Sequence, residues 1–321
     1  MGATRAEFDH ELGLIPSMAH LDEAEADRLF ERFQEMERSL LLDPTDFFRY
    51  RLFEHTMDEA SEILTHQQYA QLCGRVNDPV AASGLYDKVA FYQEYEEFLG
   101  RDWVVGVPEN RPVFKDICAR NRRVAYKTRY ATYGGDFNIM PTREQIYLWR
   151  DAVAERAIIE ELVIQHEDLA RIFPGSVNSI RVLTAIDPAG QISLVCASLR
   201  CGRDEMVTDT GGGLFAGLDL ETGALVTDGF SHLLERFERH PNTDVAFRGF
   251  VIPEFDGLLS RVHEAAGKHP ELRLVNWDWA CRNDGVWCLL QANLADGIGP
   301  CQEVLGRGLK SDLYRALGLE G

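Results

Sequence analysis

Basic residues are few in this chain. Its 321 residues include 33 lysines and arginines against 52 aspartates and glutamates, which gives a formal net charge of −19 at pH 7. Nucleic-acid binding depends on neutralising many phosphates with clustered lysine and arginine side chains. We therefore expect no nucleic-acid partner.

Long hydrophobic runs are also missing. No run reaches the roughly 20 apolar residues that a membrane-spanning helix needs. The first residues, Met-Gly-Ala-Thr-Arg-Ala-Glu, lack the apolar core of a signal peptide. We therefore expect a cytoplasmic protein without a membrane partner.

The seven cysteines form no Cys-x-x-Cys pair and have no histidine partner at zinc spacing. Free thiols in a reducing compartment are the simple interpretation. No internal repeat or low-complexity linker is visible. The hydrophobic content of 45% is enough for one large mixed domain with a smaller part appended.

The N-terminal part is predicted to be helical. Between Asp22 and Leu42 the apolar residues recur at helical spacing, and acidic residues occupy the first turn, where the helix dipole favours them. Helices are expected to continue from Phe47 to Leu72, after a break near Asp43-Pro44. We expect a helical region over residues 1–84. It would either pack on the rest of the chain or form a homodimer interface.

The remaining residues predict an α+β fold, because strands and helices alternate and short hairpins connect them. Strands are expected within 103–141, 156–164, 178–186, 192–200, 214–227, 272–281 and 286–292, and helices near 86–99, 143–155, 166–171, 254–268 and 302–317.

A C-terminal hairpin carries the most informative polar residues. Two strand-like runs, Asn276-Trp-Asp278 and Leu290-Gln291-Ala-Asn293, flank the turn-like Arg282-Asn-Asp-Gly285. Side chains alternate between the faces of a strand, so Gln291 and Asn293 share one face, and the partner strand can bring Asp278 alongside. Carboxylate and amide oxygens are ligands that suit Mg²⁺. We therefore expect a metal site at Asp278, Gln291 and Asn293.

This hairpin resembles the metal-binding hairpin of ATP-grasp enzymes, whose second strand reads Glu-x-Asn. Other matching pieces follow the order that this fold requires: Leu85-Tyr-Asp-Lys88, Val124-Ala-Tyr-Lys127, Gly134-Gly135, Ser176-Val-Asn178-Ser-Ile-Arg181, Ser198-Leu-Arg200, Asp209-Thr-Gly211-Gly-Gly213, His240-Pro241 and Trp277-Asp278. Together they resemble the sugar-transfer-associated branch of the ATP-grasp superfamily, over roughly residues 60 to 305.

The resemblance implies an ATP-grasp fold over residues 85–321, with a small nucleotide-clasping subdomain at about 103–165 and a larger catalytic subdomain at about 166–321. It also implies ATP and Mg²⁺ as cofactors. The residues implied for the nucleotide are Lys88 and Lys127 near phosphates, Glu160, Glu161 and Val163 in the adenine linker, and Asn178; those implied for the transferring group are Arg181 and Arg200.

The chain departs from the family pattern at several positions. Gln291 replaces the metal-bridging Glu, Thr210 stands where Asn follows the Asp, and Ala292 replaces a Gly. Asn276 stands where ATP-grasp ligases carry an Arg that stabilises the reacting oxyanion. A neutral amide bridges two ions less strongly than a carboxylate. Either one metal binds more weakly, or Asp209 or Glu303 supplies the missing charge, or catalysis has been lost.

By resemblance, we expect an ADP-forming ligase that joins a small-molecule carboxylate to an amine through an acyl phosphate. An amino acid, a sugar acid or a peptide would serve as the carboxylate. Two alternatives stay open. One is a kinase that phosphorylates a small alcohol or sugar from the same nucleotide site, and the other is a catalytically degenerate nucleotide-binding protein.

Overall fold

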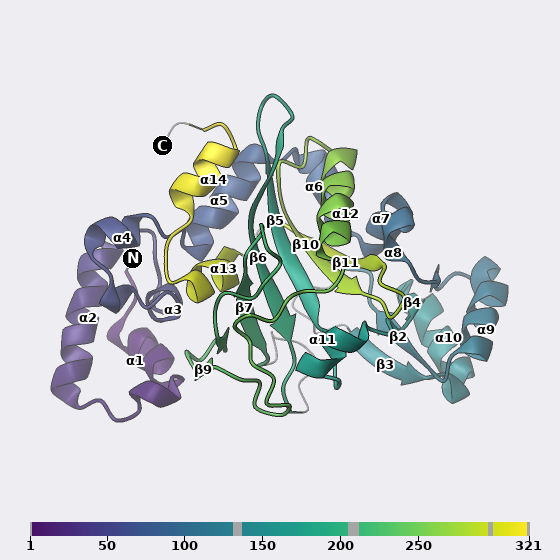
Figure 1. Ribbon diagram of the computed structural model, residues 1–321, viewed down its shortest axis with the longest axis horizontal. Helices are drawn as coiled ribbons and strands as arrows, with labels where there is room; N and C mark the ends of the chain where they lie inside the picture. Colours follow the sequence, from purple (N-terminus) through teal and green to yellow (C-terminus); the bar gives the residue numbers. More distant parts are fainter. Residues whose placement is uncertain (1, 131–136, 205–211, 295–297, 320–321) are drawn as a thin grey trace.

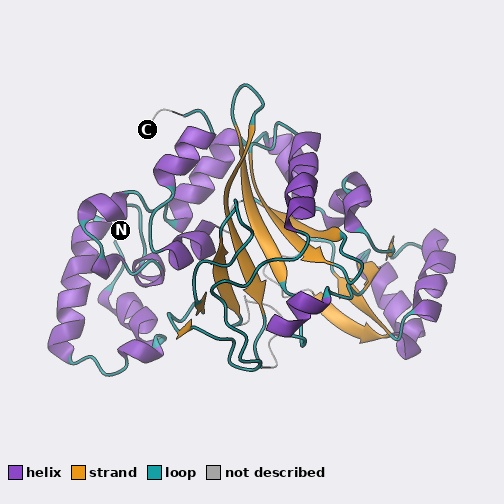
Figure 2. Cartoon of the chain, in the orientation of Figure 1, coloured by secondary structure: helices purple, strands orange, loops and turns teal. Residues whose placement is uncertain are grey.

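Two β-sheets and a set of N-terminal helices are arranged along the long axis of the molecule (Figure 1). The structure is a computed structural model that describes residues 2–130, 137–204, 212–294 and 298–319. The larger sheet lies in the middle, the smaller sheet lies at one end, and the N-terminal helices lie at the other end (Figure 2). In the described part of the chain, every helix is too short or too polar to serve as a membrane span.

The N-terminal helices enclose a hydrophobic core of their own. They are α1 (Arg5–Gly13), α2 (Glu23–Glu37), α3 (Pro44–Arg49) and α4 (Met57–Ser61), with short 3-10 turns at Pro16–Met18 and Leu52–Glu54. Phe8, Phe33 and Phe47 are fully buried between them. The break expected near Asp43-Pro44 is the start of α3: the Asp43 side chain accepts from the Asp46 backbone N–H, and proline occupies the first helical position.

Four further helices lead from this region to the sheets. They are α5 (His66–Val76), α6 (Pro79–Tyr86), α7 (Lys88–Glu94) and α8 (Glu96–Leu99). Helix α8 ends at Gly100, whose φ of +61° is readily available to glycine.

The smaller sheet has four antiparallel strands in the order β1-β4-β2-β3. They are β1 (Trp103–Val105), β2 (Arg123–Lys127), β3 (Phe137–Pro141) and β4 (Ile158–Glu161). Helices α9 (Arg111–Arg120) and α10 (Gln145–Glu155) pack on one face through Phe114, Trp149 and Ile159. Helix α9 lies inside the segment 103–141, which was expected to contain strands and for which no helix was predicted.

The larger sheet has seven antiparallel strands in the order β11-β10-β5-β6-β7-β8-β9. They are β5 (Ser179–Ile186), β6 (Ile192–Cys201), β7 (Leu214–Leu218), β8 (Gly229–Phe230), β9 (Arg236–Phe237), β10 (Leu274–Cys281) and β11 (Trp287–Asn293). Helix α11 (Glu167–Ile172) precedes β5. The segment 214–227 was expected to contain a strand, and β7 is that strand, ending at Leu218.

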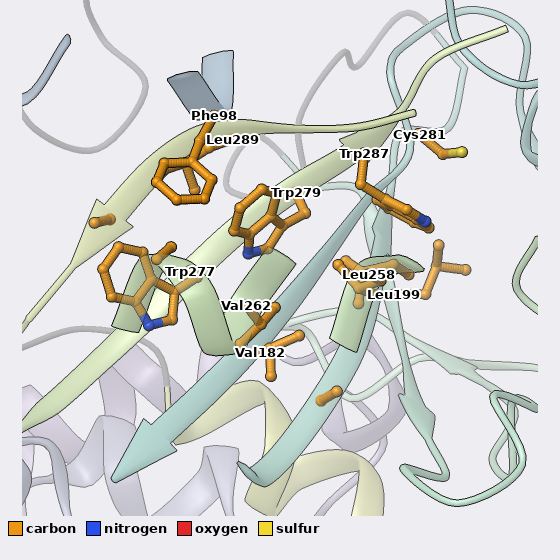
Figure 3. Close-up of a cluster of buried hydrophobic side chains, with 14 of the residues drawn as sticks. Phe98, Val182, Leu199, Leu258, Val262, Trp277, Trp279, Cys281, Trp287 and Leu289 are labelled. Atoms are coloured by element: carbon orange, nitrogen blue, oxygen red, sulfur yellow. The ribbon is translucent and has the colours of Figure 1, made fainter. Parts of the chain in front are cut away.

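One face of the larger sheet forms the main hydrophobic core. Trp277 and Trp279 of β10 and Trp287 of β11 are nearly inaccessible, and they pack with helix α12 (Phe255–Lys268) through Leu258 and Val262 (Figure 3). Because side chains alternate along a strand, Asn276 and Asp278 of β10 point to the opposite face.

That opposite face is covered only in part. Helices α5, α13 (Ile298–Leu305) and α14 (Lys310–Ala316) pack on Leu183, Cys196 and Leu274. The single helix expected near 302–317 is divided in two. Gly306 has a φ of +61°, and a Cβ at Gly308 would lie 2.0 Å from the Glu62 carbonyl oxygen. Close contact with Glu62 therefore requires glycine at 308.

Candidate active site

The predicted hairpin is present as β10 and β11. Asp278 lies directly opposite Gln291, and Asn276 lies opposite Asn293. The register shifts between Asp278 and Trp279, so that Leu290 is the extra residue of a β-bulge. Without this bulge, Leu290 would face Asp278 and Gln291 would turn to the other side of the sheet.

A buried ion pair joins this hairpin to strand β5. Arg181 lies opposite Asp278 in the register, and its Nε and Nη2 atoms donate to the two carboxylate oxygens at 2.6 Å each. Arg200 Nη1 of β6 lies 3.7 Å from Asp278 Oδ1. Burial acts to raise the pKa of Asp278, but Arg181 and Arg200 outweigh it and the pKa is lowered. Asp278 is therefore an ionised carboxylate beside both predicted catalytic arginines.

The three predicted metal ligands lie together on this face. Asn293 Nδ2 donates to Asp278 Oδ2 at 3.0 Å, and the Gln291 side-chain amide donates to Asn293 Oδ1. These oxygens fit Mg²⁺. Among the described residues, however, this cluster holds two guanidinium groups and only one carboxylate. No group of three His, Cys, Asp or Glu side chains at metal-binding spacing occurs among the described residues. The donors therefore fit an ion delivered with phosphate oxygens, and not one held by protein alone.

The residues considered as a replacement for the family's Glu lie elsewhere or outside the described residues. Glu303 of α13 pairs with Arg49 of α3, with 2.9 Å between Arg49 Nε and Glu303 Oε1, and its other oxygen lies 3.7 Å from His232 Nδ1. None of the contacts described for Glu303 reaches the hairpin. Asp209, Thr210, Gly211 and the Gly134-Gly135 pair all lie outside the described residues.

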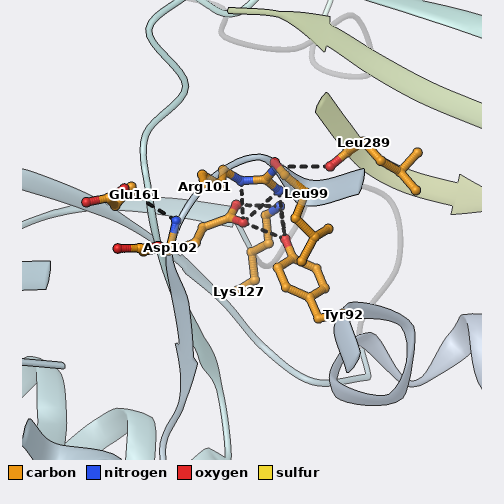
Figure 4. A network of polar contacts seen from close by, with 8 residues as sticks. Tyr92, Leu99, Arg101, Asp102, Lys127, Glu161 and Leu289 are labelled. Carbon is orange, nitrogen blue, oxygen red and sulfur yellow. Dashed lines mark hydrogen bonds and ion pairs between the residues drawn. The ribbon is translucent and has the colours of Figure 1, made fainter. Parts of the chain in front are cut away.

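A second polar cluster surrounds Lys127, at the end of β2 (Figure 4). Lys127 Nζ lies 2.6 Å from Glu160 Oε1 of β4 and donates to the Tyr92 hydroxyl at 2.8 Å. The Tyr92 hydroxyl donates to Glu160 Oε2 at 2.7 Å, and Arg101 Nε donates to the same oxygen at 2.7 Å. The structure thus brings together two predicted nucleotide residues, Lys127 and Glu160.

Charge pairing outweighs burial at Glu160. Glu160 is 3% exposed, and this burial acts to raise the pKa of its carboxyl group. The nearby charges of Arg101 and Lys127 outweigh burial and lower that pKa to about 2. For Lys127, burial acts to lower the pKa and Glu160 raises it, with a net rise. Both groups are therefore charged at neutral pH.

Tyr92 and Arg101 were not anticipated from the sequence. The only signal for Arg101 is its position, a single cation directly after the helix-ending Gly100 and before a strand. Tyr92 gives no signal, because an aromatic residue in a short helix is usually a core residue.

Lys88, the other predicted phosphate lysine, begins helix α7. Its backbone N–H donates to the Arg129 carbonyl at 3.1 Å. The Arg129 side chain pairs with Asp87, the N-cap of the same helix, with 2.5 Å between Arg129 Nη2 and Asp87 Oδ2. The start of α7 is therefore tied to the segment that follows Lys127.

The predicted adenine linker follows β4. The Glu161 side chain accepts from Asn121 Nδ2 at 2.8 Å and pairs with Arg120, away from the Lys127 cluster. Within the described residues, the backbone groups of Leu162 and Val163 have no hydrogen-bond partner. Main-chain groups without a protein partner can donate to and accept from the edge of a nucleobase.

Asn178 is fully buried just before β5. Its amide nitrogen donates to the carbonyls of Leu169 and Phe173 at 2.7 and 2.8 Å, and to Gln165 Oε1 at 3.0 Å. These bonds join the end of the linker, helix α11 and the start of β5. Asn178 therefore fixes the chain that leads to Arg181.

The chain was compared with curated proteins and with solved structures. No curated protein matches it. Solved structures with a similar arrangement include an ADP complex of N5-carboxyaminoimidazole ribonucleotide synthetase (9% identity, TM-score 0.45), D-alanyl-alanine synthetase A from Vibrio cholerae (11%, 0.47), and the ATP-grasp ligase PsnB complexed with a minimal precursor (14%, 0.47). The alignments cover 74%, 75% and 75% of this chain and 53%, 66% and 63% of those chains. The chain thus spans between half and two thirds of their length.

The family model described as sugar-transfer associated ATP-grasp matches residues 151–316. The matched part includes the linker, the larger sheet and the β10–β11 hairpin. The fold is accordingly the ATP-grasp fold, preceded by a helical N-terminal region. This chain belongs to the sugar-transfer associated ATP-grasp family.

Proposed function

We propose that this protein is an ATP-dependent ligase that joins a small-molecule carboxylate to an amine and forms ADP and phosphate. The observation that carries this proposal is the convergence of Arg181 and Arg200 on the ionised Asp278, beside two amide ligands on the next strand. Such a cluster combines cations for a transferring phosphoryl group with hard oxygen ligands.

The nucleotide site in this proposal is shared by the two sheets. Lys127, held by Glu160, and Lys88 attract the phosphates, while Glu161, Val163 and the neighbouring backbone contact adenine. Asn178 supports the chain between the linker and Arg181. A lysine acts as a compact charge, which is worth more in a desolvated cleft than in water.

The chemistry consists of two displacements. A carboxylate oxygen bonds to the γ-phosphorus while the bond from that phosphorus to ADP breaks, giving an acyl phosphate. The amine nitrogen then bonds to the acyl carbon, phosphate leaves, and the nitrogen loses a proton. Arg181 and Arg200 hold the transferring group in line and offset its charge, so that catalysis comes mainly from positioning and electrostatics.

Asp278, Gln291 and Asn293 are the residues that would hold magnesium, which when bound offsets the charge of phosphate oxygens. Binding requires Asp278 to share its oxygens with Arg181, because both accept from that guanidinium. A neutral Gln291 in place of a carboxylate favours a second candidate function, a nucleotide-binding protein that has lost turnover.

The deciding experiment is a screen of amino acids, sugar acids and short peptides with Mg·ATP, measured by phosphate release and mass spectrometry. A ligase splits ATP to ADP only when a suitable carboxylate is present, and hydroxylamine traps the acyl group as a hydroxamate. AMP and pyrophosphate as products would contradict the acyl-phosphate mechanism. A stable phosphorylated alcohol would identify a kinase, and ATP binding without turnover would identify the degenerate protein.

Binding itself is tested by thermal denaturation. A ligand that binds only the folded state raises the melting temperature by mass action. Saturating Mg·ATP should therefore stabilise the wild type, and Lys127→Ala should lose most of this stabilisation. Equal melting temperatures with and without Mg·ATP in the wild type would remove the nucleotide assignment.

A further inference from the structure

Arg101 lies at the junction of the two sheets. It occupies the short connection between α8 and β1, and its side chain is 4% exposed. The guanidinium donates to Glu160 of β4 and also to the carbonyls of Leu99 and Leu289 at 2.8 and 2.9 Å. Leu289 belongs to β11 and precedes the bulge that orients Gln291. Arg101 thus contacts both the smaller sheet and the β10–β11 hairpin (Figure 4).

Arg101 and Lys127 share a single carboxylate. Glu160 Oε1 faces Lys127 at 2.6 Å, whereas Glu160 Oε2 accepts from Arg101 Nε and from the Tyr92 hydroxyl at 2.7 Å each. Among the described residues, this cluster holds two cations around one anion, which is one positive charge in excess. If Arg101 were absent, Glu160 would neutralise Lys127 completely.

The ammonium of Lys127 also keeps bonding capacity. It has three N–H donors, and two of them go to Glu160 and to the Tyr92 hydroxyl. Within the described residues, no third hydrogen-bond partner is present. A phosphate oxygen can therefore approach without breaking the contact between Lys127 and Glu160.

We propose that Arg101 is a positioning residue for nucleotide binding: it neutralises Glu160, so that the charge of Lys127 remains available to the ATP phosphates. The inference rests on the proposed function, because Lys127 is assigned there to phosphate. Arg101 itself need not touch the nucleotide. Its effect on the nucleotide passes through Glu160 and Lys127, which distinguishes this role from a simple cross-link between the sheets.

The test is a charge-compensation cycle read by equilibrium ATP binding in a calorimeter. Arg101→Met leaves Glu160 to neutralise Lys127, and should weaken ATP binding by roughly tenfold to a hundredfold. The double variant Arg101→Met/Glu160→Gln removes both charges and leaves Lys127 positive. It should regain most of the affinity that Arg101→Met loses. A cross-link without an electrostatic role predicts that the double variant binds no better than Arg101→Met, and this result would overturn the inference.

Arg273 provides a matched control for the loss of a cross-linking arginine. It is half-buried and donates to the carbonyls of Ile186 and Leu317 at 2.8 and 2.6 Å, and no ion pair involving it occurs among the described residues. Arg273→Met should lower the melting temperature and leave ATP affinity within about twofold of wild type. A tenfold loss of affinity in this control would attribute the Arg101→Met effect to general loosening, and would overturn the inference.

A conservative variant keeps the test decisive if Arg101→Met does not fold. Arg101→Lys retains the charge beside Glu160 but loses the planar fork that reaches two carbonyls. It should melt at a lower temperature, and its ATP affinity should lie within a few-fold of the wild-type value. A loss of affinity as large as the tenfold to hundredfold loss expected for Arg101→Met would contradict the electrostatic role. A wild type that binds no ATP overturns the proposed function as well. If the wild type binds ATP and Arg101→Met binds it equally tightly, this inference alone is overturned.

Discussion

Arg181 and Asp278 lie directly opposite each other on β5 and β10, and the guanidinium of Arg181 donates to both carboxylate oxygens of Asp278. The side chains are 6% and 11% exposed, so that water screens this pair only weakly. One residue assigned to the transferring group therefore controls the geometry and charge of one assigned to the metal. The roles proposed for these two residues are therefore coupled through one ion pair.

Asp278→Asn should abolish turnover and destabilise the fold. The substitution leaves the guanidinium of Arg181 buried without its anion, and removing one partner of a buried pair typically costs about 3–5 kcal/mol. Phosphate release and urea unfolding would measure the two effects. Asp284→Asn is the control, because Asp284 lies in the turn of the same hairpin and pairs with Arg282 near solvent. Full activity in Asp278→Asn would exclude the hairpin from the mechanism.

Gly308→Ala should push the connection between α13 and α14 away from Glu62. A Cβ at this position would lie 2.0 Å from the backbone oxygen of Glu62, which cannot rotate away as a side chain can. Overpacking of this kind costs about 1–3 kcal/mol, and chemical unfolding would measure it. Gly84→Ala in α6 is the control, because nothing lies within 4 Å of its added Cβ. That variant should be as stable as wild type or more stable, since alanine favours helix.

The raised pKa of Asp46 predicts that the protein becomes less stable as the pH rises towards 7. Asp46 in α3 is 3% exposed, and burial, with Asp43 nearby, raises its pKa to about 7. Its pKa in the unfolded chain is about 3.9. The folded state therefore binds the extra proton between these values, and the free energy of unfolding falls as pH rises from about 4 to 7.

Asp46→Asn should remove this fall and stabilise the protein above pH 7. The amide oxygen can still accept from the backbone N–H of His66, which lies 3.3 Å from each carboxylate oxygen. Urea unfolding at pH 5 and pH 8 would show the difference. Asp58→Asn, an exposed substitution in the first turn of α4, should leave the pH dependence unchanged. A fall that persists in Asp46→Asn would assign it to another group.

The larger sheet could be predicted well, because the alternation of apolar and polar residues along each strand is visible in a short stretch of sequence. Alternation along Asn276–Asn293 correctly indicated a hairpin with Asp278 near Gln291, and the family order of motifs correctly indicated the ATP-grasp fold. The bulge at Leu290 was not predictable, because it depends on how two strands pair and not on either strand alone. The helix α9 was missed for a different reason: residues 111–120 stand between two strands, within a segment that was expected to contain strands.

The polar clusters were harder to predict than the sheets. Lys127 was identified from its strand and its family motif. Its partner Tyr92 comes from a helix earlier in the chain, and Arg101, which donates to the same hydroxyl, comes from a loop. Contacts over 35 residues leave no periodic signal in a single sequence. Likewise, nothing in the sequence shows that Arg181, expected to hold a phosphoryl group, pairs with Asp278, which is 97 residues away.

Gln291→Glu should strengthen metal binding. It places a carboxylate opposite Asp278 in the register, where the described cluster has two guanidinium groups and one anion. Magnesium prefers charged oxygen ligands, so the half-saturating Mg²⁺ concentration for ATP binding should fall by roughly tenfold. Val286→Glu is the control, since it adds the same charge to an exposed position beside the hairpin turn. If both variants respond to Mg²⁺ as the wild type does, Gln291 lies outside the metal site.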